Sequence, residues 1–239
     1  VVNSGTTWSG LGGTVDLSTG TLESGGGTFN LDAFTIGANS TFRLSGDTEI
    51  SSASDLTLGN LELNGNTLSL EFASVGDPAF ILPNTLTMDN VGSVIETRGS
   101  NLELSNALQL NSGSITSTGG TLRFTGGLTM GASGVLDVTG STLSVSGALD
   151  LSVGTFSSSN SSVLKLEDAA TLSSNSPVSF GSLNLNDKVL TLGSATTQLN
   201  ITDANTALAL SGITLETGDG SLTLSGALTM SSNAKLNSS

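Results

Sequence analysis

The sequence has no cysteine and no histidine among its 239 residues. The chain therefore lacks a thiol nucleophile, a disulfide framework and an imidazole base, and zinc would lack its usual ligands. Tyrosine is also absent, and Trp8 is the only tryptophan beside eight phenylalanines. A carbohydrate surface of stacked aromatic rings is therefore not expected. We expect no catalytic, cofactor-binding or metal-binding residues and no cofactor, so the chain is not expected to be an enzyme.

Basic residues are scarce, with six lysines and arginines against twenty acidic residues and a formal net charge of −14. This balance argues against nucleic acid and anionic membrane surfaces as partners, because both require a basic face. The sequence shows no signal peptide and no apolar run long enough to span a membrane, so we expect no membrane insertion. Net negative charge also keeps copies of a protein from clumping sideways.

No stretch of ten or more residues has the 3.6-residue periodicity of an amphipathic helix. What the chain has instead is an internal repeat with a period of about 21 residues. Each repeat contains a nine-residue block of the type Leu-x-Leu-x-Gly-Ala-Leu-x-Leu, at residues 102–110, 122–130, 143–151, 164–172 and 222–230. A fixed period of this size is typical of solenoids, in which each unit buries its apolar face only by stacking on its neighbours.

Within a repeat the apolar residues alternate with polar ones, as in Leu122-Arg-Phe124 and Leu128-Thr-Met130. This period of two predicts short strands, and small corner segments such as Ser146-Gly-Ala148 separate them. A third, weaker strand follows, as at residues 134–138. Triplets this short would pair poorly in the hairpins of a β-sandwich, the competing all-β fold. The pattern favours strands that pair with the coils directly above and below.

The predicted fold is therefore all-β, a single parallel β-solenoid (β-helix) with three short strands per coil. The length allows about eleven coils of roughly 21 residues, giving a rod of about 50 Å. Residues 1–239 are expected to form one continuous solenoid. We expect an irregular coil with an enlarged loop near residues 71–85, where two of the three prolines lie, and a distorted coil near 199–215.

The acidic residues are the remaining candidates for chemistry. Glycosidases use carboxylate pairs, and the close acidic pairs here are Asp47/Glu49, Glu167/Asp168 and Glu216/Asp219. We interpret them as solvated corner residues. Oxygen ligands for calcium could come from Asp187, Asp203 and Asn205, although the nonapeptide repeat of calcium-binding β-rolls is absent.

Other residues have structural predictions. The phenylalanines in apolar triplet positions are expected to pack in the core: Phe29, Phe42, Phe124 and Phe180. The outward residues of one strand position form the mixed row Glu103, Arg123, Ser144, Lys165 and Asn184. This row does not have the regular threonines of an ice-binding plane. It places Glu103 beside Arg123, where we expect an exposed ion pair between coils.

Repeats such as Gly-Ala-Leu-Thr-Met with Ser, Thr, Gly and Asn at the corners resemble bacterial surface β-helix proteins. The most similar groups are autotransporter passengers and filamentous-haemagglutinin-like adhesins and stalks. The resemblance implies a right-handed β-helix that projects from the cell and supports adhesion or matrix building. It also implies an extracellular or cell-surface location, with which the lack of cysteine is consistent.

The function expected from the sequence is that of a non-enzymatic structural fibre or stalk, built by coil stacking. Its expected partner is itself, or flanking coils of a longer chain, end to end. A first alternative is an adhesive or receptor-binding segment of a surface β-helix protein, which contacts a cell-surface or matrix ligand through the loop from Asp77 to Pro83. A more distant alternative is a β-helix enzyme that acts on polysaccharides.

Overall fold

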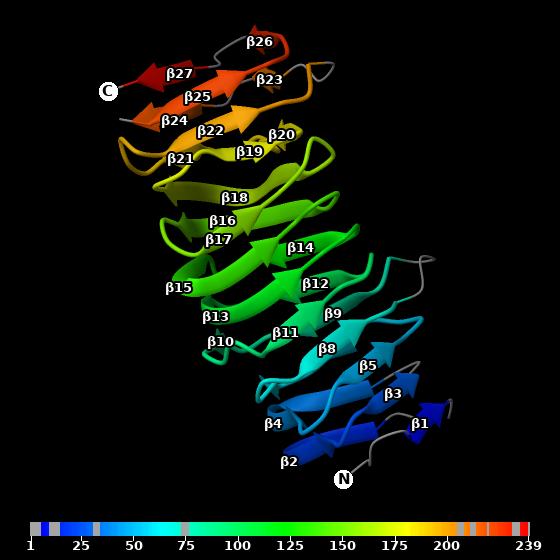
Figure 1. Ribbon diagram of the computed structural model, residues 1–239. Helices are drawn as coiled ribbons and strands as arrows, with labels where there is room; N and C mark the ends of the chain where they lie inside the picture. Colours follow the sequence, from blue (N-terminus) through cyan, green and yellow to red (C-terminus); the bar gives the residue numbers. More distant parts are fainter. Residues whose placement is uncertain are drawn as a thin grey trace.

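The computed structural model describes residues 6–9, 15–30, 34–72, 77–204, 208–210, 214–218, 220–230 and 235–238. Within these ranges all regular structure is β-strand and the strands pair in parallel, as expected. The chain winds into a β-solenoid whose coils recur about 21 residues apart. Figure 1 shows the coils stacked in sequence order from the N-terminus to the C-terminus.

Each turn contributes strands to three faces, which we name the first, second and third face. The first face contains β6, β9, β12, β14, β20, β23 and β26 and the first halves of β2, β4, β16 and β18. Their bounds are β2 (Val15–Ser24), β4 (Phe34–Leu44), β6 (Leu56–Thr57), β9 (Ala79–Leu82), β12 (Asn101–Leu104), β14 (Thr121–Phe124), β16 (Thr142–Leu151), β18 (Val163–Ser174), β20 (Ser182–Asn184), β23 (Leu208–Leu210) and β26 (Leu228–Met230).

The second face contains the second halves of β2, β4, β16 and β18 and the first halves of β13 and β15. Its other strands are β7 (Asn60–Glu62), β10 (Leu86–Met88), β21 (Leu190–Leu192), β24 (Thr214–Gly218) and β27 (Lys235–Ser238). The third face contains the second halves of β13 and β15 and nine further strands. The bounds of the two long strands are β13 (Leu108–Thr116) and β15 (Leu128–Asp137). The nine further strands are β1 (Thr6–Ser9), β3 (Gly27–Asn30), β5 (Thr48–Ser51), β8 (Thr67–Leu70), β11 (Val94–Glu96), β17 (Thr155–Ser157), β19 (Val178–Phe180), β22 (Gln198–Ile201) and β25 (Ser221–Leu224).

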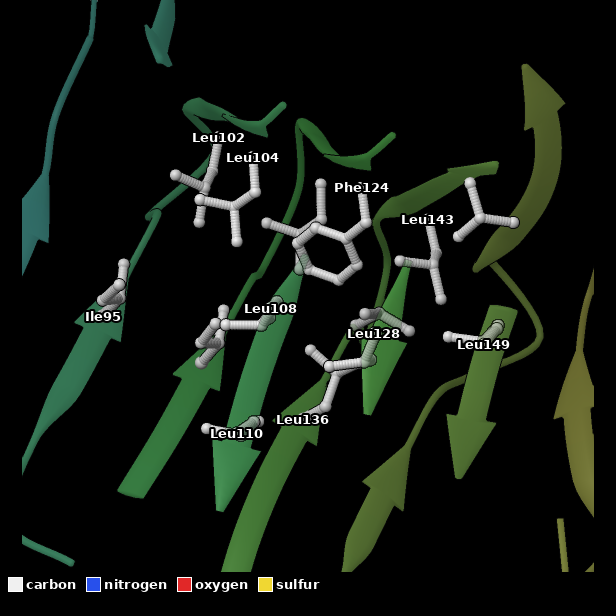
Figure 2. Close-up of a cluster of buried hydrophobic side chains, with 14 of the residues drawn as sticks. Ile95, Leu102, Leu104, Leu108, Leu110, Phe124, Leu128, Leu136, Leu143 and Leu149 are labelled. Atoms are coloured by element: carbon white, nitrogen blue, oxygen red, sulfur yellow. The ribbon is translucent and has the colours of Figure 1, made fainter. Parts of the chain in front are cut away.

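The leucines stack in columns along the rod, as predicted. On the first face Leu122 pairs with Leu143, which pairs with Leu164. On the second face Leu128 pairs with Leu149, which pairs with Leu172. These side chains are buried in one continuous core, part of which is drawn in Figure 2. Alternation puts every second side chain of a strand inside, so a regular apolar period becomes a column.

Among the described residues each face contains eleven strands or strand halves, one for each of the eleven coils expected from the sequence, but the turns differ in length. A uniform period is only an approximation, because some turns are longer than 21 residues. The largest step is from Thr67 to Val94, which are register partners although they lie 27 positions apart. The strands also differ from the expected triplets. Several run on through a corner as one element, and β13 passes from the second to the third face with a shift in register between Leu110 and Ser112.

Small residues allow these close corners. Gly113 in β13 has a φ of 81°, and a Cβ atom there would lie 2.5 Å from the carbonyl oxygen of Ser93. Only glycine combines that left-handed conformation with so close an approach to the preceding coil.

A stack of buried hydroxyl groups occupies the corner between the third and first faces. The Thr97 hydroxyl donates to Ser117 Oγ at 2.8 Å, and the Ser141 hydroxyl donates to the same atom at 2.8 Å. Ser117 in turn donates to the carbonyl oxygen of Gly119 at 2.8 Å. The three residues are buried, so the hydrogen bonds satisfy polar groups that would otherwise cost free energy.

One interpretation of the repeats needs adjustment. The block at residues 222–230 repeats the pattern of 143–151, but Leu222 pairs with Leu199 on the third face, whereas Leu143 lies on the first. The predicted loop region contains the link between β8 and β9, where residues 73–76 lie outside the described residues. Near residues 199–215 the described residues include strands β22, β23 and β24, while residues 205–207 and 211–213 lie outside them.

Candidate functional site

The most extensive group of charged side chains lies on the outer side of the first face. Glu103 and Arg123 occupy neighbouring coils in register, and Arg123 Nη1 lies 3.2 Å from Glu103 Oε2. This confirms the ion pair predicted from the sequence. Arg123 Nη2 lies 3.7 Å from Glu167 Oε2, and Lys165 Nζ lies 2.9 Å from Glu167 Oε1. We name these four residues, with Ser144, the first-face cluster.

Glu167 is the acceptor at the centre of this cluster. The Ser144 hydroxyl donates to Glu167 Oε1 at 2.6 Å, and this hydrogen bond, with that from Lys165, lowers the pKa of the Glu167 carboxyl. A general acid in hydrolysis would need the opposite shift, because it must keep its proton near neutral pH. The cluster therefore holds Glu167 in its charged form, in which it can form ion pairs between coils.

A shallow cavity of about 250 Å³ lies beside the first-face cluster. Its lining includes Glu103, Arg123 and Lys165, with Asp77 and Asn101 at the edge near the predicted loop. Asn101 Nδ2 donates to Asp77 Oδ1 at 2.6 Å, which fixes that edge to the next coil. Charges of both signs meet there, so the cavity presents hydrogen-bonding groups and no strong field of one sign.

The other two arginines also bind carboxylates of other coils. Arg98 lies 3.2 Å from Glu49, which is two coils away, and 3.1 Å from Glu96 in its own coil. Arg43 Nε lies 2.6 Å from Glu62 Oε2, and this hydrogen bond raises the pKa of the Arg43 guanidinium. All three arginines of the chain thus link coils along the rod.

The acidic pairs from the sequence have structural partners where the structure describes them. Asp47 Oδ1 accepts from the Thr67 backbone amide at 2.8 Å, and Asp168 Oδ1 accepts from the Ala169 amide at 2.8 Å. Glu216 accepts from the Thr191 hydroxyl at 3.4 Å. Asp219 lies outside the described residues.

The calcium candidates are only partly described. Asp187 lies in a turn with a φ of 59°, and Asn205 lies outside the described residues. In the described parts of the chain no three Asp, Glu, His or Cys residues gather in an arrangement that could hold a metal ion.

The aromatic prediction can be checked at four positions. Phe29, Phe42, Phe124 and Phe180 are all buried in the core, which confirms their predicted packing role. The Trp8 side chain lies outside the described part of the structure.

The sequence did not predict two clefts where the strand ladder is interrupted. On the second face β7 and β10 succeed one another without a ladder, and a cavity of about 280 Å³ lies between Leu61–Asn64 and Leu86–Asn90. On the third face β17 and β19 enclose a second cavity of about 220 Å³. A signal in the sequence is the spacing between the triplets Leu61-Glu-Leu63 and Leu86-Thr-Met88, which exceeds the period of about 21 residues.

Comparisons with known proteins identify no relative. No protein-family model matches the sequence, and neither a curated protein nor a solved structure is similar to it. None of the described residues forms a helix long and apolar enough to cross a membrane.

Proposed function

We propose that the protein is a non-enzymatic structural rod, a fibre or stalk segment that grows by stacking coil on coil. The β-solenoid fold supports this proposal, since stacked coils with ladders along the axis form a stiff, extended body. The first-face cluster, the arginine ion pairs and the buried hydroxyl stack each link coils of the rod.

The observation that carries the proposal is the apolar surface of the last described coil. Leu228 is 38% exposed, Met230 46% and Leu236 45%, whereas core residues in the central coils are buried. Within the part of the chain that the structure describes, β25, β26 and β27 pair with the preceding strands β22, β23 and β24 and with no following strand. Their outer edges therefore present backbone groups together with apolar side chains.

The covering surface would be a second copy of this chain or flanking coils of a longer chain. Among the described strands, β1 and β2 pair with the following strands β3 and β4, so their outer edges have the parallel geometry that would continue the rod. A head-to-tail contact of this kind is heterologous and gives an open filament. The net charge of −14 opposes sideways association and leaves growth along the axis.

Sedimentation velocity over a concentration series tests this assembly. The natural chain should form larger species as concentration rises, and the double variant Leu228→Asp/Met230→Asp should remain monomeric. Val91→Asp is the matched control, because Val91 is exposed on a turn in the middle of the rod and should not affect assembly. A natural chain that stays monomeric at high concentration would contradict self-assembly and favour coverage by flanking coils of a longer chain.

The finer proposal is that the rod belongs to an extracellular or cell-surface protein of the bacterial β-helix type. Its support is the resemblance of the repeats and the absence of cysteine. Cell fractionation of the source organism, with an antibody against the chain, should find it outside the cytoplasm. Recovery in the cytoplasmic fraction alone would contradict this location.

The shallow cavity on the first face favours adhesion as a second candidate function. It lies beside the loop from Asp77 to Pro83, the contact region expected from the sequence, and offers carboxylate, amide and guanidinium groups. An oligosaccharide array provides a suitable set of probes. Binding that is lost in Asp77→Ala and retained in Asp168→Ala would support adhesion, and no binding by the natural chain would argue against it.

A further inference from the structure

We propose that the rod contains a hinge at the level of β7 and β10, where the second face can open and close. The first and third faces remain hydrogen-bonded at this level and act as the pivot. The motion would bend the rod toward or away from the second face.

The second face is split at this level. Parallel strands in a ladder lie about 4.8 Å apart. Most of the Cα–Cα distances between β7 and β10 exceed 8 Å, and the cavity of about 280 Å³ fills the space between them. The same face is paired on both sides of the split, by β4 with β7 and by β10 with β13.

The other two faces are intact at the same level. On the first face Leu56 pairs with Phe80, and the Leu58 amide donates to the carbonyl oxygen of Ile81 at 3.0 Å. On the third face β8 pairs with β11 over three residues. With two faces held and one open, bending is the motion that breaks no ladder hydrogen bond.

Two hydrogen bonds that involve side chains join the coil of β7 to the coil of β10 across the split. Asn84 Nδ2 donates to Asn60 Oδ1 at 2.9 Å at one end, and the Gly65 amide donates to Ser93 Oγ at 3.1 Å at the other. Leu61, inside the split, is only partly buried, whereas Phe42 and Leu108 in the flanking coils are buried. Closure would bury the rest of Leu61 and pair the two strands.

The split between β17 and β19 has a different construction. Inside it the rings of Phe156 and Phe180 pack with their centroids 5.6 Å apart, and outside it the Ser158 hydroxyl donates to the carbonyl oxygen of Ser179. Aromatic packing therefore braces that cleft from within. The cleft between β7 and β10 has no such brace, which is why we place the hinge there.

A disulfide across the split measures closure. Glu62 and Thr87 are outward residues of β7 and β10, and the unsubstituted chain has no cysteine. A disulfide needs Cα atoms within about 7 Å, closer than most Cα pairs across the split. We expect Glu62→Cys/Thr87→Cys to form it on mild oxidation, detected by mass spectrometry. The paired rungs in Gln109→Cys/Thr129→Cys, which need no motion, serve as the positive control. Free thiols in the first variant, under conditions that fully oxidise the control, would overturn the hinge.

Amide hydrogen exchange on the unsubstituted chain provides a test that requires no variant. In parallel ladders successive residues direct their backbone groups to opposite neighbours. The Leu108 amide, on a core-facing residue, donates to the following coil, so the Leu61 amide should face the split. It should exchange faster than the Leu108 amide by a factor on the order of ten or more. The Leu58 and Val94 amides should stay protected.

Each outcome of the exchange experiment decides the proposal. Equal protection of Leu61 and Leu108 would overturn it, because the split would then be closed. Fast exchange at Leu58 and Val94 would also overturn it, because the whole level would then unfold and not bend. In the oxidised Glu62→Cys/Thr87→Cys variant, exchange at Leu61 should slow.

Discussion

At the residue scale the rod depends on side chains that repeat at one position of every coil. A core leucine contacts its counterparts in the coils above and below, so it contributes to two interfaces. Buried serines and threonines also repeat along a corner, where their hydroxyls bind each other and backbone carbonyls. These two kinds of column make different predictions when one member is removed.

Leu143 tests the apolar column. It is fully buried between Leu122 and Leu164. We expect Leu143→Ala to lower the free energy of unfolding by about 2–5 kcal/mol, because it removes buried methyl groups and leaves a cavity. Leu143→Asp should cost more, since it buries a charge without a partner. Denaturant unfolding followed by circular dichroism measures both. Leu228→Ala, at a partly exposed leucine, should lose less, and equal losses would contradict the stacking.

Ser117 tests the hydroxyl column. Ser117→Ala removes the shared acceptor of Thr97 and Ser141 and leaves buried hydroxyl groups with fewer partners. We expect a loss of about 1–3 kcal/mol in the free energy of unfolding. Ser114→Ala, on the outer side of β13, should change it by less than about 0.5 kcal/mol. Similar values for the two variants would show that the stack does not stabilise the corner.

At the scale of single elements, tight turns set the direction of each strand. Asn64 and Gly65 have φ values of 52° and 81°, and Arg98 and Gly99 have 43° and 87°. Both pairs have the positive φ at two successive residues that type I′ turns require. Asn-Gly suits such a turn, but arginine is unusual there. A positive φ is unfavourable for arginine, and the ion pairs of Arg98 with Glu49 and Glu96 hold its side chain in place at this turn.

The stability of the pairing between β14, β16 and β18 on the first face should depend on pH, because Glu167 titrates. Because its pKa is lowered in the folded state, Glu167 stabilises the fold above the ordinary carboxyl value of 4.5. This contribution is lost as the pH falls below that value and through the folded-state pKa. Glu167→Gln should therefore lower the Tm at pH 7 and have a smaller effect at pH 3.

Thermal melts of the natural chain and the Glu167→Gln variant at the two pH values measure this difference. Ser144→Ala, which removes the strongest hydrogen bond to Glu167, should reproduce part of the acid-dependent effect. An equal loss of Tm at pH 7 and pH 3 would show that the charge of Glu167 contributes nothing.

At the scale of the whole molecule, the three faces support one another. The ladder is interrupted between β7 and β10 on the second face and between β17 and β19 on the third. On the first face the described ladder stops between β20 and β23. The interruptions lie at different levels, so at each of them the other two faces remain paired. Ladder hydrogen bonds therefore connect every pair of neighbouring coils, although no single face has an unbroken ladder.

Stability of the whole rod is expected to be independent of metal ions. The coils are held by apolar columns, hydroxyl stacks and ion pairs, none of which needs a cation. Addition of a chelator should leave the Tm unchanged, measured by scanning calorimetry with and without added calcium. A drop in Tm that calcium restores would reveal a site that the described residues do not show.

The sequence by itself determined the repeat, the parallel β-solenoid and the inward columns. A strict alternation of leucine with polar residues, repeated about every 21 positions, leaves few other ways to bury the apolar side chains. It also determined the ion pair between Glu103 and Arg123, because both occupy the same outward position of successive coils. These features depend on spacing alone, which a sequence displays directly.

Only the tertiary structure decided which face each strand joins and where the ladders are interrupted. The triplets at Leu143 and Leu222 look alike, yet they lie on different faces, because a face is set by the number of corners that precede it. The split between β7 and β10 likewise coincides with a difference in turn length, since the register partners Thr67 and Val94 lie 27 positions apart. Such differences act through the stacking of neighbouring coils, which no single repeat contains.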